Sequence, residues 1–163
     1  MDFFNETIRK YISSNLTLDS KFTFEQFKVG RSNITYKIED TKNIYVLRRP
    51  PFGEKLESAH NMKREYKIIS ELYKSKIKVP KVISLCSDRN ICDEDFYIME
   101  YIDGETISDN IIANKFYKNQ KEKISKSFIR AAAELHSYDV VNSKLSDLGK
   151  HEDYVERQLT RWS

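Results

Sequence analysis

Arg48 and Glu65 are the two residues whose types and positions indicate a binding site for an anion. The run NIYVLRRPP, residues 43–51, alternates apolar side chains as a strand does, and its two prolines end the strand because they lack an N–H for a neighbouring strand. Arg48 therefore lies on the same face as Ile44 and Val46. A guanidinium at the end of an apolar face needs an anionic partner, because burying an unpaired charge is costly.

Glu65 lies in the clearest helical pattern of the chain, residues 57–74. The apolar residues of this segment recur at helical spacing, and Glu65 falls on the same stripe as Met62 and Ile69. A carboxylate that faces inward also needs a partner. The simplest prediction is that Glu65 pairs with Arg48 and orients it toward a ligand. The alternative is an ion pair that only stabilises the fold.

The elements that must position this pair follow from the rest of the pattern. Stretches with strand-like alternation are joined by turns too short for the crossover helices of a parallel sheet, and DTKN, residues 40–43, predicts a hairpin. The expected fold class is α+β, with an antiparallel sheet of about five strands and one inserted helix. In chain order, we expect a helix in 2–16, strands in 21–30, 33–40 and 43–50, the helix in 57–74, strands in 81–86 and 95–102, and helices from 105 onward.

The chain changes character once, after residue 104. Residues 1–104 alternate strands and helices, whereas residues 105–163 contain helices and connectors. A turn that contains Gly30, then a cation on a strand, then a carboxylate on a helix is the order found in the small lobe of kinases, where the pair positions a cation on nucleotide phosphates. We therefore expect residues 1–104 to form a nucleotide-binding small lobe and residues 105–163 to begin a helical large lobe.

Several stretches of the chain resemble a known family of kinases. They are, in order, GRSNITY, YVLRRPPFGEKLESAH, REYKIISEL, VPKVISLCSD, FYIMEYIDGETI, AAAELHSYD and YVERQLTRW. From about residue 28 to the end they resemble the aminoglycoside-phosphotransferase-like family, most closely the kinase domains associated with acyl-CoA dehydrogenase family members 10 and 11. In that branch an arginine commonly replaces the usual lysine, and Arg48 agrees with this.

The resemblance implies a site for ATP on the small lobe. Arg48 would contact the α- and β-phosphates, and Glu65 would orient its guanidinium. The turn before them would cover the phosphates, and the strand that ends near residue 100 would hold the adenine. The other residues implied are Gly30, Ser32 and Asn33 in the turn, Val46 against the ring, Met99 at the back of the pocket, and Glu100 and Ile102 through their backbones.

The resemblance also implies a catalytic loop, His-Gly-Asp followed five residues later by Asn, and a later Asp, which together supply the base and the Mg²⁺ ligands. The segment HEDYVERQ imitates this spacing with His151 and Asp153, but Glu152 replaces the Gly and Gln158 replaces the Asn. We interpret YVERQLTRW, residues 154–162, as an amphipathic helix instead. We therefore expect the chain to stop before the catalytic loop, to lack catalytic and metal-binding residues, and to be inactive alone.

A large lobe cut short would leave apolar side chains uncovered, which is rare in stable monomers. The side chains concerned are those of Tyr117, Phe128, Ile129 and Trp162. We expect this exposed helical face to mediate self-association or the binding of another polypeptide.

The composition argues against several other classes of protein. The 28 basic and 25 acidic residues are interspersed and leave a net charge of +3, which does not favour binding to nucleic acid or to an anionic membrane. No apolar stretch is long enough to cross a bilayer, and the first residues do not form a secretory signal. Cys86 and Cys92 fit no common zinc pattern, so we expect two reduced thiols in a cytoplasmic protein.

Three further polar residues are expected to have structural roles. Arg49 points to the face opposite Arg48 and is expected to be a solvated cation. His60 is expected to cap the helix in 57–74 or to face solvent. His136 is expected at the C-terminus of a helix, where the helix dipole favours a cation.

The predicted function is ATP-dependent transfer of the γ-phosphoryl group to a hydroxyl of a small molecule. By resemblance, the acceptor would be a hydroxyacyl-CoA or an aminoglycoside-like compound. The alternative is a non-catalytic, pseudokinase-like module that binds nucleotide and acts through its exposed helical face. A nucleic-acid-binding function is a weaker third hypothesis, because the net charge is small.

Overall fold

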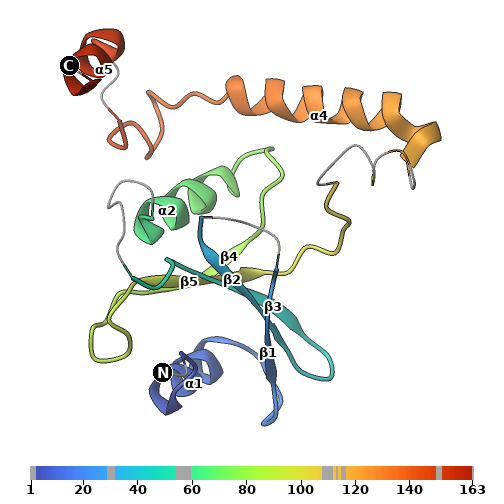
Figure 1. Ribbon diagram of the computed structural model, residues 1–163, viewed down its shortest axis with the longest axis vertical. Coiled ribbons are helices and arrows are strands. Elements are labelled where there is room, and N and C mark those ends of the chain that lie inside the picture. Colours follow the sequence, from blue (N-terminus) through green and yellow to red (C-terminus); the bar gives the residue numbers. More distant parts are fainter. Residues whose placement is uncertain are drawn as a thin grey trace.

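The computed structural model describes residues 3–28, 32–53, 60–107, 112, 114, 117–149 and 152–162. Up to residue 100 a helix is followed by three strands, a second helix and two strands, and helices follow, in the predicted order (Figure 1). The elements are α1 (Glu6–Asn15), β1 (Thr23–Gln26), β2 (Ile34–Glu39), β3 (Ile44–Arg49), α2 (Met62–Leu72), β4 (Val82–Cys86), β5 (Phe96–Glu100), the 3₁₀ turn η1 (Lys118–Gln120), α4 (Lys121–His136) and α5 (Tyr154–Trp162).

The described strands form one five-stranded antiparallel sheet in the order β1-β2-β3-β5-β4. The predicted hairpin between β2 and β3 is confirmed. Its turn is closed by the Asp40 carboxylate, which accepts the backbone N–H groups of Lys42 and Asn43 at 2.7 and 2.6 Å. These hydrogen bonds to the charged form lower the pKa of Asp40 to about 2. The antiparallel sheet and the helices beside it confirm the predicted α+β class.

Helix α1 covers one face of the sheet and builds the main hydrophobic core there (Figure 1). The helix begins at Asn5, whose side chain accepts the N–H of Ile8 at 3.0 Å. Both predicted thiols are free, and Cys86 belongs to this core. The core consists of Phe4, Ile8, Ile12, Leu16, Ile38, Leu47, Cys86, Phe96 and Ile98.

Arg49 also lies on this face, and the prediction that it is solvated is wrong. The side chain is 3% exposed. Its guanidinium carbon lies 4.3 Å from the ring centre of Phe3 and 3.8 Å from that of Phe52, and Nε donates to the carbonyl of Pro50 at 3.1 Å. Burial lowers the pKa of Arg49. The strand alternation was read correctly, but the aromatic rings that cover this position could not be placed from the sequence.

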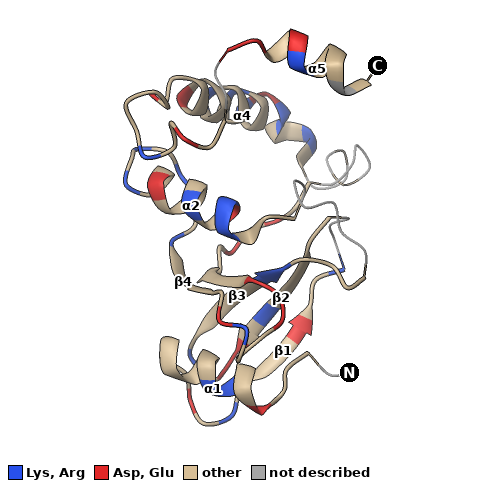
Figure 2. Ribbon diagram, turned by 90° about the vertical axis from the view of Figure 1, so that its left-hand side faces the viewer, with Lys and Arg blue, Asp and Glu red and all other residues tan. Residues whose placement is uncertain are grey.

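Helix α2 lies on the opposite face of the sheet, against β4 and β5. It begins at Asn61, whose side chain accepts the N–H of Arg64 at 2.9 Å. Met62 and Leu72, at the two ends of its apolar stripe, are buried. Charged residues of both signs are interspersed over the described elements (Figure 2).

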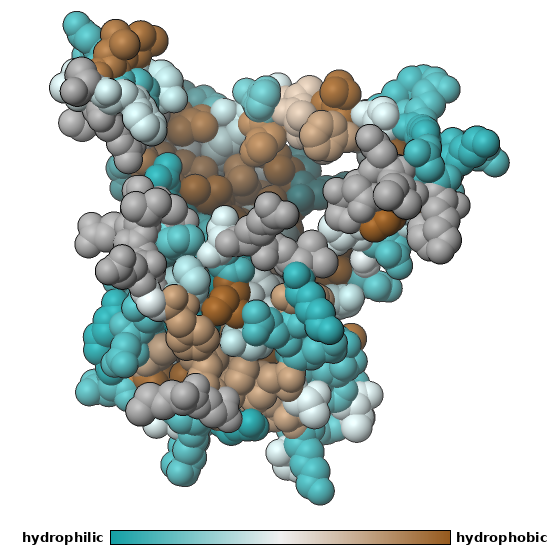
Figure 3. Space-filling view, in the orientation of Figure 1, coloured by the Kyte–Doolittle hydropathy of each residue, from teal (hydrophilic) through white to brown (hydrophobic). Residues whose placement is uncertain are grey.

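The helices after residue 117 carry exposed apolar side chains, as predicted for Phe128, Ile129 and Trp162, whereas Tyr117 is half-buried. Phe128 on α4 is 71% exposed and Trp162 on α5 is 84% exposed. Apolar surface is visible over α4 and where the chain leaves it (Figure 3). The association expected of this surface stays a prediction. None of the helices in the described part of the chain is long and apolar enough to cross a membrane.

Candidate functional site

Arg48 and Glu65 meet as predicted. Nε of Arg48 donates to Oε2 of Glu65 at 2.8 Å, and each side chain is about one-third exposed (31% and 30%). The pair forms because Arg48, the last residue but one of β3, lies on the face that α2 covers, and because Glu65 lies in the first turn of α2 on its sheet side. The contact predicted from the sequence is confirmed. The ligand-binding role of the two residues stays a prediction.

The guanidinium of Arg48 is held from two sides. In addition to the bond to Glu65, Nη1 donates to the hydroxyl of Thr35 at 3.3 Å. Thr35 lies directly opposite Arg48 on β2. Among the described residues, Nη2 has no hydrogen-bond partner. Because the planar group is fixed at two nitrogens, the third can donate to an anion without further ordering of the side chain.

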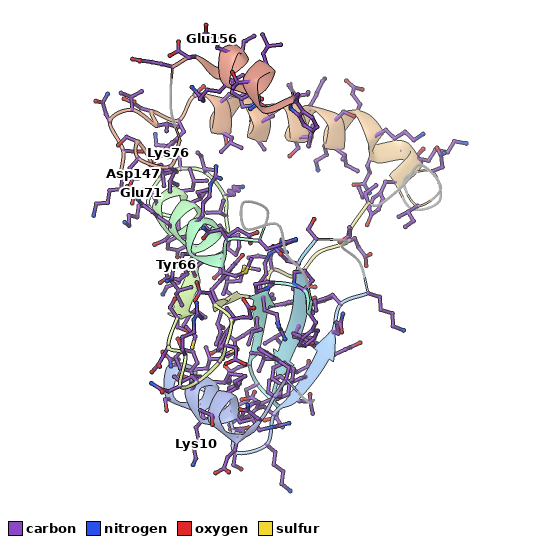
Figure 4. All side chains as sticks on the ribbon, turned by 60° about the vertical axis from the view of Figure 1, so that its left-hand side comes forward. Lys10, Tyr66, Glu71, Lys76, Asp147 and Glu156 are labelled. Carbon is purple, nitrogen blue, oxygen red and sulfur yellow. The ribbon has the colours of Figure 1, made fainter. Side chains whose placement is uncertain are left out.

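Glu65 is the centre of a wider hydrogen-bond network. Oε1 accepts from Nδ2 of Asn33 at 2.7 Å, and Oε2 accepts from the hydroxyl of Tyr97 at 3.1 Å. Tyr97 is buried and lies opposite Arg48 on β5. Burial first, and then the charge of Glu65, raise the pKa of this phenol. Its ring lies 6.2 Å from that of Tyr66, which Figure 4 labels on α2.

Thr35 and Tyr97 were missed by the sequence analysis. Both are cross-strand neighbours of Arg48, one on each side. The hairpin register of β2 and β3 could have indicated Thr35, because directly opposed residues point to the same face. Tyr97 could not be found in this way, because β3 and β5 are distant in the sequence and their register does not follow from a local pattern.

His60 and Asn33 join the turn before β2 to the start of α2. Nδ1 of His60 lies 2.8 Å from Oδ1 of Asn33. The prediction that His60 caps the helix or faces solvent is wrong, since Asn61 is the cap and His60 is half-buried. The side chain of Asn33 faces Glu65 and His60, and its expected place over the phosphates stays a prediction. Ser32 is exposed beside it, and Gly30 lies outside the described residues.

A cavity of about 290 Å³ lies beside the ion pair, between α2 and the sheet. Arg48 and Glu65 form its polar end, and apolar side chains form most of the remainder. Val46, predicted to contact the adenine ring, is buried directly opposite Met99 on the same face. The cavity is lined by Arg48, Glu65, Ile68, Ile69, Pro80, Tyr97 and Met99. An apolar cavity with a cation at one end suits a ligand with a flat apolar part and an anionic part.

Glu100 and Ile102, expected to bind adenine through their backbones, lie where β5 ends. The N–H of Glu100 donates to the carbonyl of Lys81 at 2.9 Å, and its carboxylate accepts the N–H of Lys81 at 2.8 Å. The amide of Glu100 is therefore in use within the fold. Ile102 follows the strand and is 61% exposed.

A magnesium site was not expected in this chain. Within the ranges that the structure describes, no group of three or more His, Cys, Asp or Glu side chains could hold a metal ion. The described residues thus do not fit a metal centre. His151, which imitates the catalytic loop, lies outside the described residues, whereas the segment after it forms α5 as predicted.

Comparisons with known proteins agree with this arrangement. The model of the phosphotransferase enzyme family matches residues 23–163. Mouse acyl-CoA dehydrogenase family member 10 is 33% identical over 160 residues, which are 97% of this chain and 15% of that protein. Human acyl-CoA dehydrogenase family member 11 is 28% identical over 166 residues, which are 99% of this chain and 21% of that protein.

A solved structure is also similar. The crystal structure of a protein assigned as an aminoglycoside phosphotransferase, from Ralstonia eutropha, superposes with a TM-score of 0.75 at 28% identity. The similarity covers 96% of this chain and 45% of that one. The chain therefore spans less than half of the solved structure and a smaller part of both acyl-CoA dehydrogenase relatives.

Proposed function

The chain belongs to the phosphotransferase enzyme family, and we propose that it forms the nucleotide-binding part of an ATP-dependent kinase that phosphorylates a hydroxyl of a small molecule. The observation that carries the proposal is the Arg48–Glu65 pair beside an apolar cavity, with one nitrogen of the guanidinium left to donate. Kinases of the protein-kinase type use a strand cation and a helix carboxylate in this way to position the phosphates of ATP.

In the proposed complex the phosphates lie toward Arg48 and the base lies along the sheet. Nη2 of Arg48 donates to the α- or β-phosphate, while Glu65 and Thr35 fix the plane of the guanidinium. Val46 and Met99 contact the adenine. The carbonyl of Glu100 and the N–H of Ile102 bind its polar edge. We assign this binding to residues 1–104.

We propose further that the base and the magnesium ligands of the reaction belong to a part of the enzyme that these 163 residues do not include. The coverage of the solved structure, 45%, supports this. The chain alone is then expected to bind ATP without transferring phosphate. The names of the relatives mention acyl-CoA and aminoglycosides, and we propose a hydroxyacyl-CoA or an aminoglycoside-like acceptor. Two free thiols suit a reducing compartment, and we propose the cytoplasm as the site of action.

Titration with ATP tests the nucleotide site. We expect the unsubstituted chain to bind ATP and Arg48→Ala to bind it at least about tenfold more weakly, because a hydrogen bond to a charged phosphate is lost. Arg130→Ala is the matched control, since Arg130 is exposed on α4. Affinities are measured by calorimetry, with thermal melts to show that each variant is folded.

Two outcomes would contradict the proposal. One is an unsubstituted chain that does not bind ATP. The other is an Arg48→Ala variant that binds as well as Arg130→Ala. Consumption of ATP in the presence of a hydroxyl acceptor by this chain alone would leave the nucleotide site in place and disprove the proposed inactivity.

A further inference from the structure

We infer that Asn33 is a positioning residue which, held by His60, keeps the Arg48–Glu65 pair in a single-contact form and so leaves Nη2 of Arg48 free for phosphate. The inference deepens the proposed function and rests on it. The observation that suggests it is the number of bonds that converge on Glu65. Oε2 accepts from Arg48 and Tyr97, and Oε1 accepts from Asn33.

An arginine and a carboxylate that meet side by side usually form two parallel hydrogen bonds. On the side of the guanidinium that carries Nε, the second donor is Nη2. Here Nε reaches Oε2 of Glu65, so that Oε1 would be the natural acceptor for Nη2. That oxygen accepts from the amide of Asn33 at 2.7 Å, a bond that fixes the rotation of the carboxylate. Because a carboxylate oxygen can accept two hydrogen bonds, as Oε2 does, Asn33 acts by orienting the carboxylate so that Oε1 does not meet Nη2 of Arg48.

The direction of the hydrogen bonds fixes the orientation of Asn33. An ionised carboxylate only accepts, so the NH₂ group of Asn33 must face Glu65 and its carbonyl must face His60. Nδ1 of His60, at 2.8 Å from that carbonyl, is then the donor. His60 immediately precedes Asn61, the N-cap of α2, so the start of the helix holds the amide in its orientation.

The consequence is specific to the phosphate end of the ligand. If Asn33 is removed, the carboxylate can turn and Nη2 of Arg48 can close the second bond to Glu65. The ion pair then becomes stronger, while one of the two N–H groups of Nη2 is withdrawn from the phosphate. A purely structural role of Asn33 predicts the contrary, a weaker fold and a weaker site for every part of the nucleotide.

The test compares ATP with adenosine, which lacks the phosphates. For Asn33→Ala we expect about tenfold weaker binding of ATP, because one hydrogen bond to a charged group is lost. Binding of adenosine should be unchanged. NMR titrations of the labelled chain measure both ligands, including weak binding. Asn119→Ala is the control, because Asn119 is exposed on η1. The melting temperature without ligand should not fall below that of the control.

Substitutions of His60 extend the test. His60→Ala should also weaken ATP binding, but by less than Asn33→Ala does. In the double variant, His60→Ala should cause no further loss beyond that of Asn33→Ala. His60→Gln should recover most of the affinity, because its amide N–H can donate to the carbonyl of Asn33. His136→Ala, on an exposed position of α4, is the control. If Asn33→Ala does not fold, this series decides the question.

Each outcome has a defined meaning. Two outcomes would overturn the inference and leave the proposed function intact. In one, Asn33→Ala loses as much affinity for adenosine as for ATP. In the other, Asn33→Ala binds ATP as well as the parent does, although Arg48→Ala has lost ATP affinity. Additive effects of the two substitutions would also overturn it. A failure of the unsubstituted chain to bind ATP would remove the inference together with the proposed function.

Discussion

The two faces of the sheet differ in how they are covered. The face under α1 is closed by hydrocarbon and aromatic rings, and most of its core side chains are almost fully buried. The face under α2 carries the ion pair of Arg48 and Glu65 and a cavity of about 290 Å³. One helix thus completes a hydrophobic core, whereas the other holds polar side chains in place over an accessible space.

The difference indicates a division of roles between the two faces. A dense core tolerates no loss of volume and fixes the strands relative to each other. A partly open polar face would be poorly defined without such support, because its hydrogen bonds exchange with bonds to water and contribute little net stability. We therefore attribute the stability of the sheet mainly to α1, and the binding properties mainly to α2 and the strands beneath it.

Matched substitutions of isoleucine on the two faces should give the largest effect. Ile12 on α1 is fully buried, whereas Ile69 on α2 lines the cavity and is half-buried. Ile12→Ala should lower the free energy of unfolding by about 2–5 kcal/mol, since it leaves a void in a closed core. Ile69→Ala should cost clearly less, because less apolar area is re-exposed. Urea denaturation measures both. Equal costs would show that the two faces do not differ in this way.

Removal of the Tyr97 hydroxyl should have an intermediate effect. Tyr97→Phe breaks the 3.1 Å bond to Glu65 and should lower the free energy of unfolding by about 1 kcal/mol at neutral pH. The pKa of this phenol is raised in the folded chain above its ordinary value of 10.0, so the unfolded chain loses the proton first. Stability should therefore fall as the pH rises above about 10.

Comparison of the parent with Tyr97→Phe isolates the contribution of the Tyr97 phenol to this pH dependence of stability. Denaturation is measured at about pH 8 and about pH 11 in the parent and in Tyr97→Phe. The decrease between the two pH values should be smaller in the variant, which has no phenol at this position. A decrease of the same size in both chains would show that Tyr97 is not the group responsible.

The smallest effect is expected where α2 meets the segment that precedes α5. Nζ of Lys67 lies 2.6 and 2.8 Å from the two carboxylate oxygens of Asp147, on the surface. Figure 4 shows Asp147 close to Glu71 of α2. Lys67 lowers the pKa of Asp147, so the bond contributes above the ordinary pKa of 3.8 and is lost as the pH falls.

Lys67→Met should change the melting temperature at neutral pH only slightly, because exposed ion pairs are weak and screened by salt. Melts at low and high salt measure the effect, and the small difference from the parent should shrink at high salt. A large, salt-independent loss would indicate that the Lys67–Asp147 ion pair, and not the burial of apolar side chains such as Leu72 and Leu145, holds the segment against α2.

The sequence predicted more of the polar face than of the core face. Strand alternation placed Arg48 and Val46 on one side, and helical periodicity turned Glu65 inward, because both periods are local properties of the chain. The prediction for Arg49 was wrong because it rested on the same local pattern. Alternation showed that it points away from Arg48, but only the folded chain brings Phe3 and Phe52 over it.

The amino-acid sequence by itself determined the order of the elements, the antiparallel hairpin and the opposite charges that would meet. These follow from repeat distances of a few residues. The tertiary structure decided which other side chains complete the site. Asn33 reaches Glu65 from a turn and Tyr97 reaches it from a strand, while His60, just before a helix, holds Asn33. Their positions depend on pairing between distant segments, which no local pattern encodes.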